Sequence, residues 1–168
     1  TRSCYTHVGM VLKNPTYLHK DLQGYYVWES SWNYVNNKIK FGVQITPLEL
    51  MYKNYDGKMF YRKINNGYDL FTEDKLKEIY KKVYKKPYDI NPFDWIEAYF
   101  GVDLQPQKTN RFFCSALVGY VYTKLGILEP NTDWSILRPS DFSMESRDEY
   151  IDLKDGFKLD DEQIEILN

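Results

Sequence analysis

The sequence predicts a single domain of the α+β class, because its strand-like and its clearest helical segments occupy different parts of the chain. The strand-like segments gather in the first 64 residues, and the strongest helical patterns follow them. The chain has 168 residues, 43% of them hydrophobic, which is enough for one core. We see no internal repeat or low-complexity linker, so we treat residues 1–168 as one domain.

Four short segments have the composition of β-strands. The first is an apolar run that ends at the turn signal Asn14-Pro15, and the second is rich in aromatic residues. A short helical turn at residues 47–52 and a turn at residues 54–57 separate the last two. We expect the first two strands to pair antiparallel because they are consecutive. In chain order the candidates are residues 7–12, 25–31, 42–45 and 59–64.

The clearest helix covers residues 73–85, where apolar side chains recur at spacings of three and four. Thr72 can cap its start, and Pro87 lies just past its end. Its many lysines suggest either a solvated outer face or a surface for an anionic partner. The apolar positions are Leu76, Ile79, Tyr80, Val83 and Tyr84.

Two further helices are expected. A short one covers residues 93–99, and a longer one covers about residues 111–125. Either Thr109 or Asn110 can cap the longer helix. Gly126 stands where a left-handed C-terminal cap is wanted, so we expect the helix to end there.

Charge and hydropathy exclude some classes of partner. The net charge is −2, whereas general nucleic-acid binders usually need a basic excess. We find no apolar run long enough to span a membrane and no signal peptide at the start. A protein partner is a further expectation, and the compositional bias of an AT-rich genome is the alternative explanation of the many tyrosines. The candidate surfaces for a partner are the sixteen tyrosines and the acidic extension at residues 147–168, which carries apolar side chains with which to dock.

Cys4 and Cys114 are the only cysteines, so a disulfide framework is not expected and a reducing compartment is favoured over secretion. Cys114 lies near the start of the helix at residues 111–125. Unpaired backbone N–H groups and the helix dipole stabilise a thiolate there, and the thiolate is the nucleophilic form. The alternative is that Cys114 is a small core residue.

A cysteine nucleophile needs a base, and the chain has two histidines. His7 begins a predicted strand, whereas His19 lies in a polar loop, so His7 is the better candidate. Glu29 is the only acid in the second strand. If His7 stands opposite Glu29, both side chains project from the same face, and the carboxylate can orient the imidazole. The alternative for Glu29 is an edge-strand carboxylate in water.

A metal site is the rival interpretation of the same region. Cys4 and His7 have the spacing of two metal ligands, but a zinc site needs three or four, and no second pair is spaced to complete it. The chain also has no glycine-rich phosphate loop and no serine nucleophile elbow. We therefore predict neither a metal nor a cofactor.

Three segments resemble the circularly permuted branch of the NlpC/p60 superfamily of papain-like thiol hydrolases, which includes bacterial YiiX-like proteins and homologues in large cytoplasmic DNA viruses. In most papain-like enzymes the cysteine precedes the histidine. Here the order is His, acid, Cys, as in the permuted branch. The main matches are YTHVGMV at residues 5–11, VWES at 27–30 and FFCSALV at 112–118. Secondary matches are GVQITPL at 42–48, KPYD at 86–89, LGIL at 125–128 and RPSD at 138–141.

The resemblance covers roughly residues 5–142 and implies a papain-like fold, with the cysteine helix packed on a small antiparallel sheet. It implies a catalytic triad of Cys114, His7 and Glu29. A virion is then an expected location besides an intracellular one, because the tyrosine, lysine and asparagine bias fits a viral origin. Two features depart from the family. Relatives usually have a strand and a loop before the histidine motif, so we expect an N-terminal piece to be missing, cleaved or disordered. Relatives also often carry an acidic residue where this chain has Ala116.

The expected function is a cysteine hydrolase that acts on a peptide, amide or lipid-acyl bond through a thioacyl intermediate. Ser115 is a candidate for the substrate pocket or oxyanion hole, and Tyr5 or Thr6 is a candidate oxyanion donor. The alternative is a catalytically silent virion or scaffold protein that uses the same fold to bind a protein partner. A complete Cys–His–Glu set favours the enzyme, because an interaction module does not need all three residues.

Overall fold

The computed structural model describes residues 3–35, 38–87, 112–145, 151 and 153–166, and side chains are described for these except at 33–35 and 38–40. Small antiparallel sheets and a few helices share one core, so the predicted α+β class is confirmed. The predicted helix at 93–99 and the predicted caps Thr109 and Asn110 lie outside the described residues.

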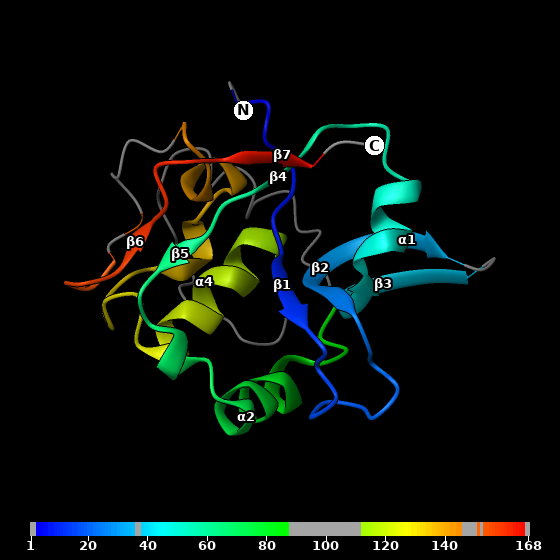
Figure 1. Ribbon diagram of the computed structural model, residues 1–168, viewed down its shortest axis with the longest axis horizontal. Coiled ribbons are helices and arrows are strands. Elements are labelled where there is room, and N and C mark those ends of the chain that lie inside the picture. The colour runs from blue at the N-terminus through cyan, green and yellow to red at the C-terminus, as the bar shows by residue number, and fades with distance from the viewer. Residues whose placement is uncertain (1–2, 36–37, 88–111, 146–150, 152, 167–168) are drawn as a thin grey trace.

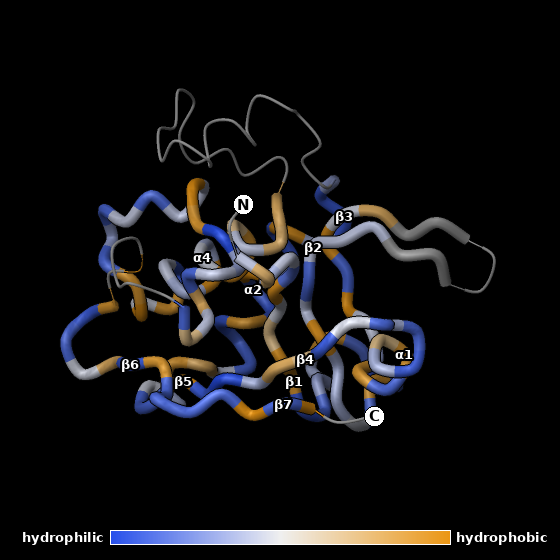
Figure 2. Tube along the Cα trace, turned by 90° about the horizontal axis from the view of Figure 1, so that it is seen from above, coloured by the Kyte–Doolittle hydropathy of each residue, from blue (hydrophilic) through white to orange (hydrophobic). Residues whose placement is uncertain are grey.

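The main sheet has three antiparallel strands in the order β1–β2–β3. They are β1 (Met10–Lys13), β2 (Tyr25–Val35) and β3 (Lys38–Pro47). The predicted antiparallel pairing of the first two strands is therefore confirmed. The predicted start at residue 7 was wrong, because pairing with β2 begins only at Met10, which faces Trp28. Strands β2 and β3 run on past their predicted ends as a hairpin that projects from the rest of the domain (Figures 1 and 2).

The predicted helical turn after β3 is α1 (Leu48–Lys53). The single strand predicted at residues 59–64 is instead two short ones, β4 (Met59–Tyr61) and β5 (Ile64–Asn65). Each pairs with a strand from the acidic extension: β4 with β7 (Ile164–Ile166), and β5 with β6 (Lys158–Leu159). The described part of the extension therefore docks on the domain, and Figure 1 shows it running alongside β4 and β5.

The lysine-rich helix is α2 (Glu73–Val83), and Thr72 caps it as predicted by accepting a hydrogen bond from the backbone N–H of Lys75. It ends at Val83, two residues before the predicted end, because Lys85 takes a left-handed conformation (φ 59°) and bonds to the backbone of β3. The described residues also form short 3₁₀ turns: η1 (Tyr68–Leu70), η2 (Trp134–Ile136) and η3 (Pro139–Phe142).

The cysteine helix is α4 (Cys114–Leu125), and it is buried on most sides. Gly126 ends it in the predicted left-handed conformation (φ 81°). The helix begins at Cys114 itself, three residues later than predicted, because Phe113 is extended and serves as its N-cap. Cys114 is thus the first helical residue.

The hairpin β2–β3 separates an apolar face from a polar one. Trp28 and Val43 point into the core formed with α2 and α4. Because side chains alternate along a strand, Glu29, Gln44 and Thr46 lie on the opposite face, where all three are buried. The core thus holds the hairpin against the cysteine helix, and the opposite face offers buried polar groups to a site.

Candidate active site

Cys114 is fixed in place by the residues that precede it. The backbone N–H of Phe112 donates to the carbonyl of Pro87, and its carbonyl accepts the hydroxyl of Ser30 on β2 at 2.7 Å. The chain therefore enters α4 while attached to the sheet, with Cys114 only 4% exposed. The thiol lies where the backbone N–H groups of a helix lack intrahelical partners, a position that favours an anion.

His7 lies in the irregular segment just before β1, and its ring joins Cys114 to Glu29. Its Nε2 atom is 2.8 Å from the Oε2 atom of Glu29. The ring also forms a side-chain hydrogen bond with Cys114. The three residues proposed from the sequence thus meet at the imidazole, although they come from three separate segments. The His7 side chain is 31% exposed, so solvent reaches this part of the site.

Glu29 is 1% exposed, and both of its carboxylate oxygens are hydrogen-bonded. Oε2 faces His7, and Oε1 accepts the hydroxyl of Thr46 at 2.5 Å. The assumption that His7 stands directly opposite Glu29 was wrong. It is Gly9 that lies against this residue, since a Cβ added at Gly9 would be 3.4 Å from the Glu29 Cβ. His7, two residues earlier in the chain, reaches Glu29 through its Nε2 atom.

Electrostatics favour a charged pair of thiolate and imidazolium. Burial lowers the pKa of His7, but the hydrogen bonds and negative charges of Cys114 and Glu29 outweigh this and raise it to about 10. Burial raises the pKa of the Cys114 thiol, but the hydrogen bond and positive charge of His7 overcome this and bring it below its ordinary value. Each group stabilises the charged form of the other, as an activated thiol requires.

Two backbone N–H groups also point at the sulfur. Those of Val8 and Ser115 hydrogen-bond to Cys114 and contribute to its lowered pKa. They come from different segments, one just before β1 and the other at the start of α4. Donors in this arrangement can stabilise negative charge that develops next to the sulfur. Val8 was not among the residues singled out from the sequence, since a backbone donor leaves no mark on residue type.

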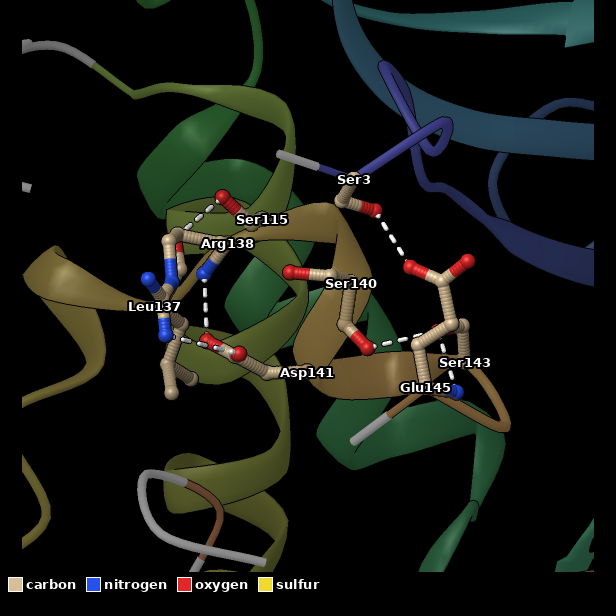
Figure 3. A network of polar contacts seen from close by, with 8 residues as sticks. All are labelled: Ser3, Ser115, Leu137, Arg138, Ser140, Asp141, Ser143 and Glu145. Carbon is tan, nitrogen blue, oxygen red and sulfur yellow. Dashed lines mark hydrogen bonds and ion pairs between the residues drawn. The ribbon is translucent and has the colours of Figure 1, made fainter. Parts of the chain in front are cut away.

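The three residues suggested for the pocket have different surroundings. The Ser115 hydroxyl donates to the Leu137 carbonyl at 2.5 Å (Figure 3). The Tyr5 hydroxyl accepts from the side-chain amide of Gln163 at 2.6 Å, and Thr6 is exposed. Among the three, only the Ser115 backbone is placed at the sulfur by a described contact.

The other histidine and the other cysteine lie apart from this arrangement. His19 is exposed and pairs with Asp21, 3.4 Å away. Cys4 is exposed, and its thiol contacts Glu145, whose other carboxylate oxygen accepts the hydroxyl of Ser3 (Figure 3). Within the described part of the chain, no three His, Cys, Asp or Glu side chains gather as metal ligands would.

Comparison of the chain with protein-family models, with curated proteins and with solved structures finds no significant match. None of the helices in the described ranges has the length and apolar character needed to cross a bilayer.

Proposed function

We propose that the protein is a cysteine hydrolase in which Cys114 is the nucleophile, His7 the general base and acid, and Glu29 the group that orients the imidazole. The observation that carries the proposal is the double contact of His7, with the Cys114 thiol on one side and the Glu29 carboxylate on the other. A buried thiol with a lowered pKa and a histidine partner is the arrangement that nucleophilic catalysis by cysteine uses.

The reaction follows from the charged pair. The Cys114 thiolate attacks a carbonyl carbon, and the carbonyl electrons move to oxygen, where backbone N–H groups near the sulfur can stabilise them. Collapse of this intermediate expels an amine or alcohol, which takes the proton held by His7, and leaves a thioester on Cys114. His7 then removes a proton from water, the resulting hydroxide attacks the thioester, and the thiolate departs with the imidazolium restored.

We also propose that the fold is a permuted papain-like one. The order His7, Glu29, Cys114 along the chain, and the position of Cys114 as the first residue of a buried helix beside a small antiparallel sheet, support this assignment. The substrate of such a fold is a peptide, amide or lipid-acyl bond. These substrate classes are taken from the family that residues 5–142 resemble.

Alkylation by iodoacetamide near neutral pH tests the proposal. Cys4 serves as an internal reference, because the two thiols are separated by mass spectrometry of their peptides. We expect Cys114 to be alkylated faster than Cys4. His7→Ala should slow the alkylation of Cys114 by tenfold or more, since a rise of one unit in the thiol pKa lowers the thiolate fraction about tenfold. His19→Ala is the matched control and should leave the rate unchanged. Slow labelling of both cysteines, unaffected by His7→Ala, would favour the silent scaffold protein instead.

Turnover requires a separate screen. Peptides, isopeptides, peptidoglycan fragments and lipid esters are incubated with the wild-type protein and with Cys114→Ser, and products are detected by mass spectrometry. We expect at least one class to be hydrolysed by the wild type alone, with a thioester adduct on Cys114 when the reaction is quenched in acid. Turnover that survives in Cys114→Ser would contradict the assignment of the nucleophile.

A further inference from the structure

Two side chains contact the carboxylate of Glu29. One is His7, and the other is Thr46, which has no role in the reaction proposed above. Thr46 lies near the end of β3 and is 5% exposed. Its hydroxyl donates to Glu29 Oε1 at 2.5 Å, while Oε2 of the same carboxylate faces His7 Nε2 at 2.8 Å. The contacts thus form one series from Thr46 through Glu29 to His7 and on to Cys114.

The strand register explains why Thr46 is the donor. Glu29 faces Gln44 directly across the hairpin, and Thr46 is two residues farther along β3 on the same face. Gln44 gives its side-chain amide N–H to the Ser31 hydroxyl at 2.6 Å, on the side away from Thr46. Thr46 is also β-branched, so its side chain has few rotamers and loses little freedom in holding this position.

We propose that Thr46 is a positioning residue of the site, which fixes the Glu29 carboxylate so that its other oxygen stays aimed at His7. It touches none of the reacting atoms and acts only through Glu29. The inference rests on the proposed function, since it assigns Thr46 a part in the same catalytic arrangement.

The physical argument concerns orientation. A carboxylate that is 1% exposed cannot draw on water for hydrogen bonds, so its protein donors decide how it turns about the side-chain axis. If the Thr46 hydroxyl is lost, Glu29 Oε1 loses a donor, and the carboxylate can turn toward other groups. The imidazolium of His7 then loses part of its support, and so does the thiolate that pairs with it.

Three variants separate the hydroxyl from the shape of the side chain. Thr46→Val keeps the shape and removes the hydroxyl, Thr46→Ser keeps the hydroxyl, and Thr46→Ala is a second variant without it in case the valine variant folds poorly. Thr132→Val is the matched control, because the buried Thr132 hydroxyl has no hydrogen-bond partner among the described residues. Thermal unfolding confirms that each variant is folded before it is compared.

Two measurements report on the series. The imidazole of His7 is titrated by nuclear magnetic resonance, which is simple in a chain with two histidines, with His19→Gln assigning the signals. Alkylation of Cys114 by iodoacetamide is followed against pH. In Thr46→Val we expect the His7 titration to move down by about one pKa unit and the alkylation midpoint to move up by a similar amount. Thr46→Ser and Thr132→Val should both resemble the wild type.

The outcomes distinguish this inference from the proposed function. If Cys114 is activated in the wild type and Thr46→Val leaves both titrations unchanged, the positioning role is overturned and the proposed function stands. The positioning role is also overturned if Thr46→Ser shifts both titrations as much as Thr46→Val does, because the loss of the hydroxyl then does not cause the shifts. If Cys114 in the wild type reacts no faster than Cys4, the proposed function is overturned and the role of Thr46 with it.

Discussion

At the scale of single residues, the site depends on a carboxylate that water hardly reaches. Glu29 is 1% exposed, and burial of a charged group is costly unless partners compensate. His7 and Thr46 are such partners, and the raised pKa of His7 is the other side of the same interaction. We therefore expect the activation of Cys114 to depend more on the negative charge of Glu29 than on the shape of its side chain.

Replacing Glu29 by glutamine tests this charge. Glu29→Gln keeps the size of the side chain but removes the charge that supports the His7 imidazolium, so the pKa of His7 should fall from about 10 toward its ordinary value. We expect Cys114 alkylation near neutral pH to slow by roughly tenfold or more. Glu49→Gln removes an exposed carboxylate paired with Lys53 and is the control. Equal rates in wild type and Glu29→Gln would show that the charge is not needed.

The sequence identified residue types at this scale but not all of their contacts. Cys114 and His7 each have one rival in the chain, and Glu29 is the only acid in its predicted strand, although the chain has 24 acidic residues. Thr46 is not distinctive, and its importance depends on a register between β2 and β3 that a single sequence does not specify. The N–H group of Val8 was equally hidden, because every residue except proline has one.

At the scale of elements, the site depends on a close approach between the segment before β1 and strand β2. Gly9 lies so near β2 that an added Cβ would be 2.6 Å from Val27 Cγ1 and 3.1 Å from the Trp28 carbonyl oxygen. Only a residue without a side chain allows this approach. Since His7 is two residues away, the distance from His7 to Glu29 depends on it.

Gly9→Ala should push the segment away from β2 and weaken the contact between His7 and Glu29. We expect slower Cys114 alkylation, by several-fold or more, in a protein that remains folded. Val27→Ala removes the nearest obstacle, so the double variant Gly9→Ala/Val27→Ala should recover part of the lost rate, with Val27→Ala alone as the control. A Gly9→Ala variant that labels Cys114 at the wild-type rate would contradict this account.

Element boundaries show what sequence patterns can and cannot provide. The periodic helix α2 and its cap Thr72 were predicted correctly because amphipathic spacing and capping are local signals. The start of β1 was wrong, since an apolar run does not reveal where pairing with a neighbour begins. The late start of α4 likewise depends on the extended conformation of Phe113, which no residue type nearby required.

At the scale of the whole molecule, the last strands of the chain close the fold against earlier segments. β6 and β7 pair with β5 and β4, and the Gln163 amide reaches back to the Tyr5 hydroxyl. The sequence indicated only that the acidic extension carries apolar residues. Strands of two or three residues have too little periodicity to be recognised, and their partners lie about 100 residues away in the chain.

Leu159 in β6 tests whether the extension is part of the core. It is 7% exposed and packs in the core cluster, so Leu159→Ala should lower the free energy of unfolding by about 2–4 kcal/mol in urea denaturation. Ile164 in β7 is 58% exposed, and Ile164→Ala should cost under about 1 kcal/mol. Similar losses in the two variants would mean that the extension contributes no specific packing.

The charged pair of Cys114 and His7 is tested most directly by the pH dependence of Cys114 alkylation in a Cys4→Ser background. The thiolate persists above the lowered pKa of Cys114, and His7 stays protonated until its pKa of about 10. We predict rapid alkylation at pH values below the ordinary thiol pKa, a decline only as the pH falls through the lowered Cys114 pKa, and a further change in rate near pH 10. A single rise at the ordinary thiol pKa of about 8.5, unchanged by His7→Ala, would contradict the account.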